Sequence, residues 1–195
     1  MSFPDILAGA CAGDQGAAAV LFTDLQPRLL RFLRSAEPRV ADDLASEVWV
    51  AMVQGLRSFE GDLAGFRSWV FTIARRRLAD HRRTAVRRGT DPVDPHEFFS
   101  GRADTATSSD TATMVMDQMS AQEAIDLISS SLPPEQAEVL LLRVIGELDV
   151  AHVAEVLDRT PNWVRVTQHR ALRRLAEKMS RTSPSVVMTD DPETI

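Results

Sequence analysis

The segment from Phe59 to Arg83 (FEGDLAGFRSWVFTIARRRLADHRR) constrains the fold most, because it indicates an acidic loop followed by a helix with two unlike faces. At helical spacing one side is apolar, as in a helix that packs against other helices, and carries Phe66, Trp69, Val70 and Ile73. The opposite side is polar and positively charged, and carries Ser68, Thr72, Arg75, Arg76, Arg82 and Arg83. We therefore expect a helical bundle that exposes a basic stripe.

The basic stripe suits nucleic acid, because the planar guanidinium groups of arginine match phosphates and stack on bases. Aromatic residues interleave with the stripe, and unpaired bases stack on such rings. They are Phe59, Phe66, Trp69 and Phe71. Phe66 and Trp69 fit the core better, which leaves Phe59 and Phe71 as candidates for stacking. A solvated basic helix face is the alternative interpretation.

Together with DDLASEVWVAMVQ at Asp42–Gln54, the pattern FxGDxxxFRSWxFxIARxxxxDHRR resembles region 2 of bacterial RNA polymerase sigma factors, and most of all the compact extracytoplasmic-function (ECF) group. The resemblance implies that the helix at Asp42–Gln54 binds a coiled coil of the largest polymerase subunit. The polymerase-binding candidates are Asp43, Ser46, Glu47, Val50 and Gln54. Ser46 stands where the family usually has glutamine. Without the resemblance, Asp43 and Glu47 would be interpreted as a solvated acidic face.

The resemblance also gives the loop and the basic helix a role at the promoter. In the family the loop forms a pocket for a base flipped out of the −10 element, an act that costs unstacking energy. The DNA-contact candidates in this part of the chain are Phe59, Thr72, Arg75, Arg76 and Arg83. Arg76 stands where the family commonly has asparagine, so the family's base preference does not carry over. Glu60 and Asp62 suggest acid–base chemistry only weakly, because no nucleophile or metal ligand accompanies them, and capping fits better.

The C-terminal half has the spacing of a helix-turn-helix. Helical patterns cover Met114–Ser131 and LPPEQAEVLLLRVIGEL, and Asp149 can cap the short helix that follows. After the turn Asp158-Arg159-Thr160, Thr160 can cap a second helix with Pro161 in its first position. Many helical hairpins share this spacing, so the pattern alone does not establish DNA binding.

The second helix of this pair, Pro161–Leu175, is the candidate recognition helix, and its segment VRVTQHRALRRL resembles sigma region 4. The residues that can project outward are Asn162, Arg165, Val166, His169, Arg170 and Arg173. The resemblance places Arg165, Val166, His169 and Arg170 at the upstream (−35) promoter element. Arginine pairs with guanine bidentately in the major groove, and Val166 can contact a thymine methyl group. For Arg173 a phosphate contact or plain solvation is expected.

Composition narrows the possible partners. The chain of 195 residues has a formal net charge of −6, which argues against a protein that coats nucleic acid without help from a larger partner. A single cysteine excludes an intramolecular disulfide, and no segment is apolar enough for a membrane span or a leader peptide, so we expect a cytoplasmic protein. The four histidines, His81, His96, His152 and His169, lack ligand spacing, and we predict neither a metal site nor a cofactor.

We therefore predict an all-α fold of two small helical domains. A region 2-like bundle spans 1–86 and a region 4-like helix-turn-helix domain spans 114–180. A segment rich in Asp, Thr, Ser, Pro and Gly joins them as a flexible, acidic linker at 87–113. Residues 181–195 are predicted to be a disordered tail.

Three classes of function are compatible with parts of the sequence. A sigma factor explains both halves, and its partners would be RNA polymerase core enzyme, promoter DNA and an anti-sigma factor. An ordinary helix-turn-helix regulator explains the C-terminal half equally well, but not the aromatic and basic helix after Gly61. An enzyme is the least supported, because the chain has no phosphate-binding loop and no nucleophile–base pair.

Overall fold

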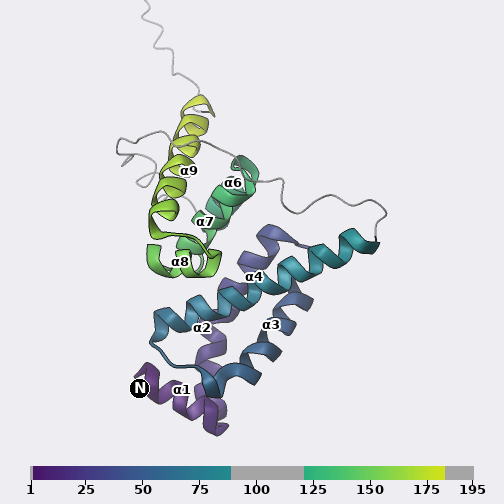
Figure 1. The fold of residues 1–195 in the computed structure, drawn as a ribbon, viewed down its shortest axis with the longest axis vertical. Coiled ribbons are helices and arrows are strands. Elements are labelled where there is room, and N and C mark those ends of the chain that lie inside the picture. The colour runs from purple at the N-terminus through teal and green to yellow at the C-terminus, as the bar shows by residue number, and fades with distance from the viewer. Residues whose placement is uncertain (1, 89–120, 183–195) are drawn as a thin grey trace, which may run out of the picture.

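The computed structural model describes residues 2–88 and 121–182, and the secondary structure of these residues is helical throughout (Figure 1). The N-terminal unit contains α1 (Phe3–Ala12), α2 (Gln15–Ala36), α3 (Ala41–Gly55), a short 3-10 turn at Leu56–Ser58, and α4 (Leu63–Arg88). The C-terminal unit contains α6 (Ala121–Ser131), α7 (Pro134–Val144), α8 (Val150–Leu157) and α9 (Pro161–Thr182). The predicted all-α, two-domain fold is confirmed.

Several predicted boundaries differ from those of the helices. Helix α4 continues to Arg88, past the predicted end of the first domain, and α9 continues to Thr182, into the predicted tail. The predicted linker from residue 89 onward, the first residues of the helix predicted from Met114, and the tail from residue 183 all lie outside the described residues.

The N-terminal unit is a bundle in which α2, α3 and α4 pack against one another and α1 packs on α2. Its core is made of fully buried side chains, which include Leu25, Leu29, Phe32, Val48, Phe66, Val70 and Phe71. Asp14 caps α2 by accepting a hydrogen bond of 2.7 Å from the amide of Gly16. A short carboxylate at Asp42 or Asp43 is the cap that the sequence predicts for α3. This prediction is wrong: Val40 holds the N-cap position and no side chain bonds there. Both acids lie in the first turn, where their negative charges stabilise the positive end of the helix dipole.

The C-terminal unit confirms the predicted caps of its helix-turn-helix. The Asp149 carboxylate accepts a hydrogen bond from the amide of His152 at 2.9 Å, and the Thr160 hydroxyl accepts one from the amide of Trp163 at 3.2 Å. Asp158 ends α8 in the left-handed conformation, with φ 54°, which turns the chain into α9. Asparagine and aspartate tolerate this conformation better than other side chains do.

The two units share one continuous hydrophobic core, because α8 packs along α4 and α6 contacts α2 (Figure 1). Gly146, between α7 and α8, makes the close approach possible. A Cβ at this position would lie 3.2 Å from Cε2 of Phe71 and 2.6 Å from the carbonyl oxygen of Leu142, so a larger residue would push α7 or α8 off α4.

Candidate nucleic-acid interface

The first part of the predicted DNA-binding stripe on α4 lies against the C-terminal unit. Ser68 is only 3% exposed, and its hydroxyl donates to the carbonyl of His152 on α8 at 3.4 Å. The Thr72 hydroxyl donates to the carbonyl of Ser68 at 2.9 Å. The guanidinium of Arg75 donates through Nε to Oε1 of Glu138 on α7 at 3.1 Å. In this arrangement Thr72 and Arg75 are engaged by the protein itself.

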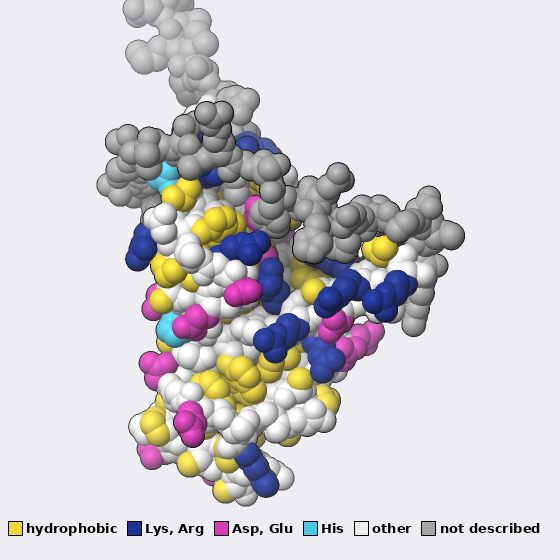
Figure 2. Space-filling model, viewed as in Figure 1, with side chains coloured by type: hydrophobic (Ala, Val, Ile, Leu, Met, Phe, Trp, Pro, Cys, Tyr) yellow, Lys and Arg dark blue, Asp and Glu magenta, His cyan; other side chains and the backbone are white. Residues whose placement is uncertain are grey.

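The second part of the stripe is open to solvent. Arg76 and Arg83 are exposed, and the Arg83 guanidinium pairs with Asp80 one turn earlier, at 2.6 Å. The neighbouring Arg82 pairs with Glu37 at the end of α2, at 2.8 Å. Basic side chains gather over the C-terminal half of α4 (Figure 2). This half therefore presents the positive charge that phosphates require.

The two aromatic residues predicted to stack on bases have different surroundings. Phe71 is 1% exposed and packs edge-on against Phe32, with ring centroids 5.4 Å apart, so the prediction for Phe71 is wrong. Its burial comes from both units, since Gly146 also lies against its ring. Phe59 is half-buried, and one face of its ring stacks on Trp69 with a centroid distance of 5.3 Å. A base contact by Phe59 stays a prediction.

The loop before α4 is held by local contacts. A Cβ at Gly61 would lie 3.0 Å from the ring of Phe59, and φ 150° at this residue is a conformation that other residues rarely adopt. Asp62 accepts a hydrogen bond from the amide of Gly65 at 2.8 Å, the capping role that the sequence favoured over acid–base chemistry. Gly65 itself lies inside α4 and not in the loop. These contacts fix the conformation of the loop at the start of α4.

The outward face of α9 is largely open. Asn162, Arg165 and Arg173 are exposed, whereas Val166, His169 and Arg170 are half-buried. The buried side of the helix carries Val164, Thr167, Ala171 and Leu175. Trp163 packs at the start of the helix, with the guanidinium of Arg159 5.5 Å from its ring centroid. The exposed residues nearest the turn are the ones that a recognition helix presents to base edges.

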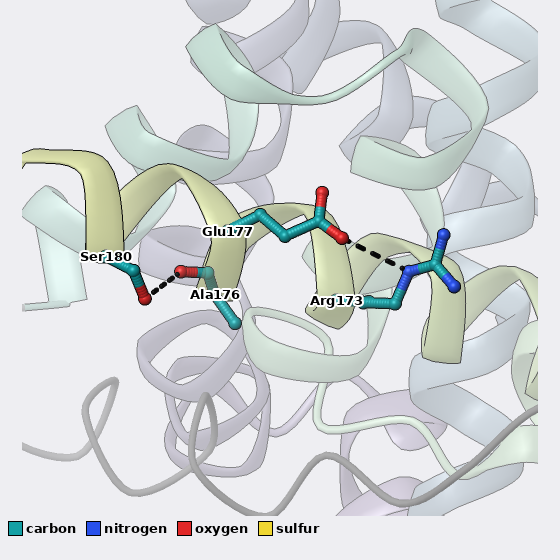
Figure 3. A pocket seen from close by; sticks show the side chains of 4 residues that line it. All are labelled: Arg173, Ala176, Glu177 and Ser180. Atoms are coloured by element: carbon teal, nitrogen blue, oxygen red, sulfur yellow. Dashed lines mark hydrogen bonds and ion pairs between the residues drawn. The ribbon is translucent and has the colours of Figure 1, made fainter.

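Farther along α9 the exposed side chains bond within the helix. Arg173 pairs with Glu177 at 3.4 Å, and the Ser180 hydroxyl donates to the carbonyl of Ala176 at 2.9 Å (Figure 3). A guanidinium held beside an acid of its own helix is better suited to a phosphate at the rim than to a base edge. A phosphate contact by Arg173 stays a prediction.

The predicted polymerase-binding residues share the exposed face of α3. Asp43, Ser46, Glu47, Val50 and Gln54 are all exposed. The Ser46 hydroxyl donates to the carbonyl of Asp42 at 3.0 Å, and Glu47 lies 4.0 Å from Arg77 of α4. That ion pair accounts for Arg77, an arginine on an otherwise apolar side of its helix.

The structure adds apolar residues to this face that the sequence pattern missed. Trp49 is half-buried and packs on Phe22 of α2 with a centroid distance of 4.9 Å. Phe22 is 48% exposed and Val53 is 63% exposed. Val53 follows Val50 by three residues, so helical spacing alone predicts that the two share a face. Phe22 belongs to α2, and it reaches the same surface only because α2 packs on α3. Acids and apolar groups therefore alternate on this face.

Comparison with known proteins agrees with this geometry. The family model for sigma-70 region 2 matches residues 21–88, and the model for sigma-70 region 4 matches residues 122–175. The ECF RNA polymerase sigma factor ShbA of Streptomyces griseus is 33% identical over 174 residues, which cover 85% of this chain and 89% of ShbA. The chain belongs to the ECF RNA polymerase sigma factors. Like them, it recognises promoters and directs transcription initiation by RNA polymerase.

Further relatives also match over most of the length of this chain. The ECF sigma factor SigD of Mycobacterium tuberculosis is 29% identical over 180 residues, covering 89% of this chain and 82% of SigD. Among solved structures, CnrH in complex with the cytosolic domain of CnrY superposes with a TM-score of 0.58 at 20% identity, covering 91% of this chain and 97% of CnrH. RpoE of Bartonella quintana, in complex with the anti-sigma factor NepR, gives 0.58 at 19% identity, covering 85% of this chain and 98% of RpoE. At these identities the two structures support the fold.

Two further features of the described segments bear on function. Within residues 2–88 and 121–182, no group of three potential ligands from His, Cys, Asp and Glu is placed to hold a metal ion. In the same part of the sigma factor, no helix has both the length and the apolar character of a membrane span.

Proposed function

We propose that this sigma factor binds core polymerase through the exposed face of α3 and divides promoter recognition between its two units. The loop at Phe59–Asp62 and the basic stripe of α4 melt and read the −10 element, and α9 reads the −35 element. The protein acts in the cytoplasm, beside the polymerase, and without chemistry of its own.

The observation that carries this proposal is the separation of three surfaces on three helices. The face of α3 is acidic and apolar, which suits a protein partner and repels DNA. Helices α4 and α9 belong to different units, and each presents exposed arginines, Arg76 on the first and Arg165 on the second. An ordinary regulator needs only the second of the two DNA surfaces.

Reconstituted transcription tests the proposal most directly. The purified sigma factor with core polymerase and a library of promoter DNA should select a −10 and a −35 sequence, and permanganate should detect unpaired thymines near the start site. Glu47→Lys should weaken binding to core polymerase by roughly tenfold, because it reverses a charge at the centre of the α3 face.

The matched control is Asp42→Lys, since Asp42 is an exposed acid of the same helix that pairs with Arg34 outside the predicted contact. It should bind core polymerase like the wild type. Equal binding by all three proteins, with unchanged circular dichroism, would remove α3 from the polymerase interface.

We also propose that an anti-sigma protein holds this sigma factor inactive. The support is the fold shared with RpoE, whose structure contains the anti-sigma factor NepR. Co-purification of an inhibitory protein with the tagged chain from its own host, and its release when transcription begins, would identify the partner.

A further inference from the structure

Helix α1 lies along the connection between α3 and α4, which contains the candidate −10 loop at Phe59–Asp62 (Figure 1). Near the start of α1, the ring of Phe3 lies 5.6 Å from the ring of Phe66 in the first turn of α4, measured between centroids. Near its end, the thiol of Cys11 donates to the carbonyl of Leu56 at 3.7 Å. Leu56 precedes the loop and Phe66 follows it, so α1 contacts both ends of the segment that holds the loop.

Phe66 connects α1 to the loop itself. Its side chain is 0% exposed, and the ring of Phe59 packs edge-on against it with a centroid distance of 5.2 Å. The ring of Phe59 in turn limits the backbone of the loop, because even a Cβ at Gly61 would lie 3.0 Å from it. Pairs of aromatic rings stabilise a contact beyond the area that they bury. A continuous set of contacts therefore runs from Phe3 through Phe66 and Phe59 to the backbone of the loop.

Helix α1 is held in place independently of the loop. At its start the Ser2 hydroxyl accepts a hydrogen bond from the amide of Asp5 at 3.4 Å, and the Asp5 carboxylate accepts one from the amide of Ser2 at 2.9 Å. Farther along, Gly9 lies so close to α2 that a Cβ there would be 2.9 Å from the Cβ of Ala17, which is 1% exposed. The helix is thus a rigid support for the loop beside it.

The composition of α1 argues against a direct contact with DNA. The helix has one acid, Asp5, and neither lysine nor arginine, so it offers no positive charge to phosphates. Its larger apolar side chains, which include Phe3, Ile6 and Leu7, pack against the core. The helix also precedes residue 21, where the match to sigma-70 region 2 begins. An effect of α1 on promoter DNA therefore has to pass through the loop.

We propose that α1 positions the −10 loop for base capture, and that Phe3 is the positioning residue through which it acts. This inference rests on the proposed function of the loop. Capture of a flipped-out base costs unstacking energy, and a loop that is already held in its binding conformation loses less conformational freedom on binding. Loss of the Phe3 contact therefore weakens base capture and relaxes the preference at the −10 element, while α3 and α9 keep their surfaces.

Two substitutions of Phe3 test the proposal. Phe3→Ala removes the ring from Phe66 and leaves the cap of α1 and its packing on α2 in place. Phe3→Leu keeps an apolar side chain but no ring, and it serves if the alanine variant proves unstable. The matched control is Leu127→Ala: Leu127 is also a half-buried apolar residue packed against the core, but it belongs to α6 of the C-terminal unit.

Hydrogen exchange of the full chain tests the positioning without DNA. The amides to follow are those of Phe59 and Gly65, which are both hydrogen-bonded within this segment. They should exchange about three- to tenfold faster in Phe3→Ala, the factor that corresponds to the loss of an aromatic pair. Phe3→Leu should lie between Phe3→Ala and wild type, and Leu127→Ala should match wild type. Unchanged exchange in both Phe3 variants would overturn the proposal, whatever the loop binds.

Transcription from randomised promoters, with core polymerase present, measures the consequence for DNA. Phe3→Ala should reduce the preference at the −10 element by about three- to tenfold and leave the selected −35 sequence and the affinity for core polymerase unchanged. A general loss of stability would instead weaken all three, and Leu127→Ala reports its size.

Phe59→Ala, in the loop itself, separates this inference from the proposed function. If Phe59→Ala relaxes the −10 preference while Phe3→Ala keeps it, the loop reads the −10 element but α1 does not position it. If Phe59→Ala also leaves the selected −10 sequence unchanged, the proposed function of the loop is wrong, and the role of α1 at the promoter falls with it.

Discussion

The predicted DNA surfaces of α4 and α9 carry similar residues but lie in different surroundings. On α4, Thr72 bonds back to Ser68 of its own helix and Arg75 pairs with Glu138 of α7, and the C-terminal half of the stripe is more exposed than this part. On α9, Asn162 and Arg165 stand exposed beside the turn that positions them. A basic residue on a helix therefore indicates a possible DNA contact, whereas the packing of the other unit decides how exposed that residue is.

The largest effect on stability is expected from Phe71, a buried residue of α4. Phe71→Ala removes a ring that is 1% exposed and that contacts both Phe32 and Gly146. The loss of buried area and the cavity should lower the free energy of unfolding by about 3–5 kcal/mol. Urea denaturation of the full chain measures this loss of stability. The control is Phe22→Ala: because the Phe22 side chain is 48% exposed, its removal should lower the free energy of unfolding by about 1 kcal/mol or less. Similar costs for both would mean that the ring of Phe71 is not buried in solution.

A smaller effect should separate base contacts from phosphate contacts on α9. Arg165→Ala should relax the preference at one position of the −35 element by about 1–3 kcal/mol, because a bidentate base contact is lost. Arg173→Ala should weaken transcription from all promoters alike and reduce its salt dependence, as expected of a phosphate contact. Transcription from randomised promoters, with core polymerase present, measures both. An unchanged −35 sequence with Arg165→Ala would contradict the assignment of α9 as the recognition helix.

Local features of the fold could be predicted from the sequence, because their causes lie within a few residues. The caps at Asp149 and Thr160 depend on side chains bonding amides three residues ahead, and both are present. The amphipathic pattern of α4 likewise identified Phe66 and Val70 as core residues, and both are buried.

The remaining features depend on contacts between distant segments. Ser68 and Phe71 lie on a face that helical periodicity assigns to solvent, and the packing of the C-terminal unit on this face contributes to their burial. Glu147, in the loop between α7 and α8, pairs with Arg28 of α2 and Arg67 of α4, and no spacing within any one segment indicates these ion pairs. Asp42 failed as a cap for a local reason: α3 begins at Ala41, two residues earlier than a cap at Asp42 requires.

The smallest effect on stability is expected in the turn between α8 and α9, which positions the exposed face of α9. Asp158 adopts φ 54° and its amide donates to the carbonyls of Ala154 and Glu155, so the position needs a residue that tolerates the left-handed conformation. Asp158→Gly removes the steric cost but adds freedom to the unfolded chain, and the free energy of unfolding should rise by no more than about 1 kcal/mol. Asp158→Ala keeps the steric cost and loses the local bonding that aspartate offers, so it should be less stable than wild type by about 1 kcal/mol. Thermal unfolding of the three proteins measures this order. If alanine is as stable as glycine, the turn is not held left-handed in solution, and the position of α9 must depend on its packing against α7 instead.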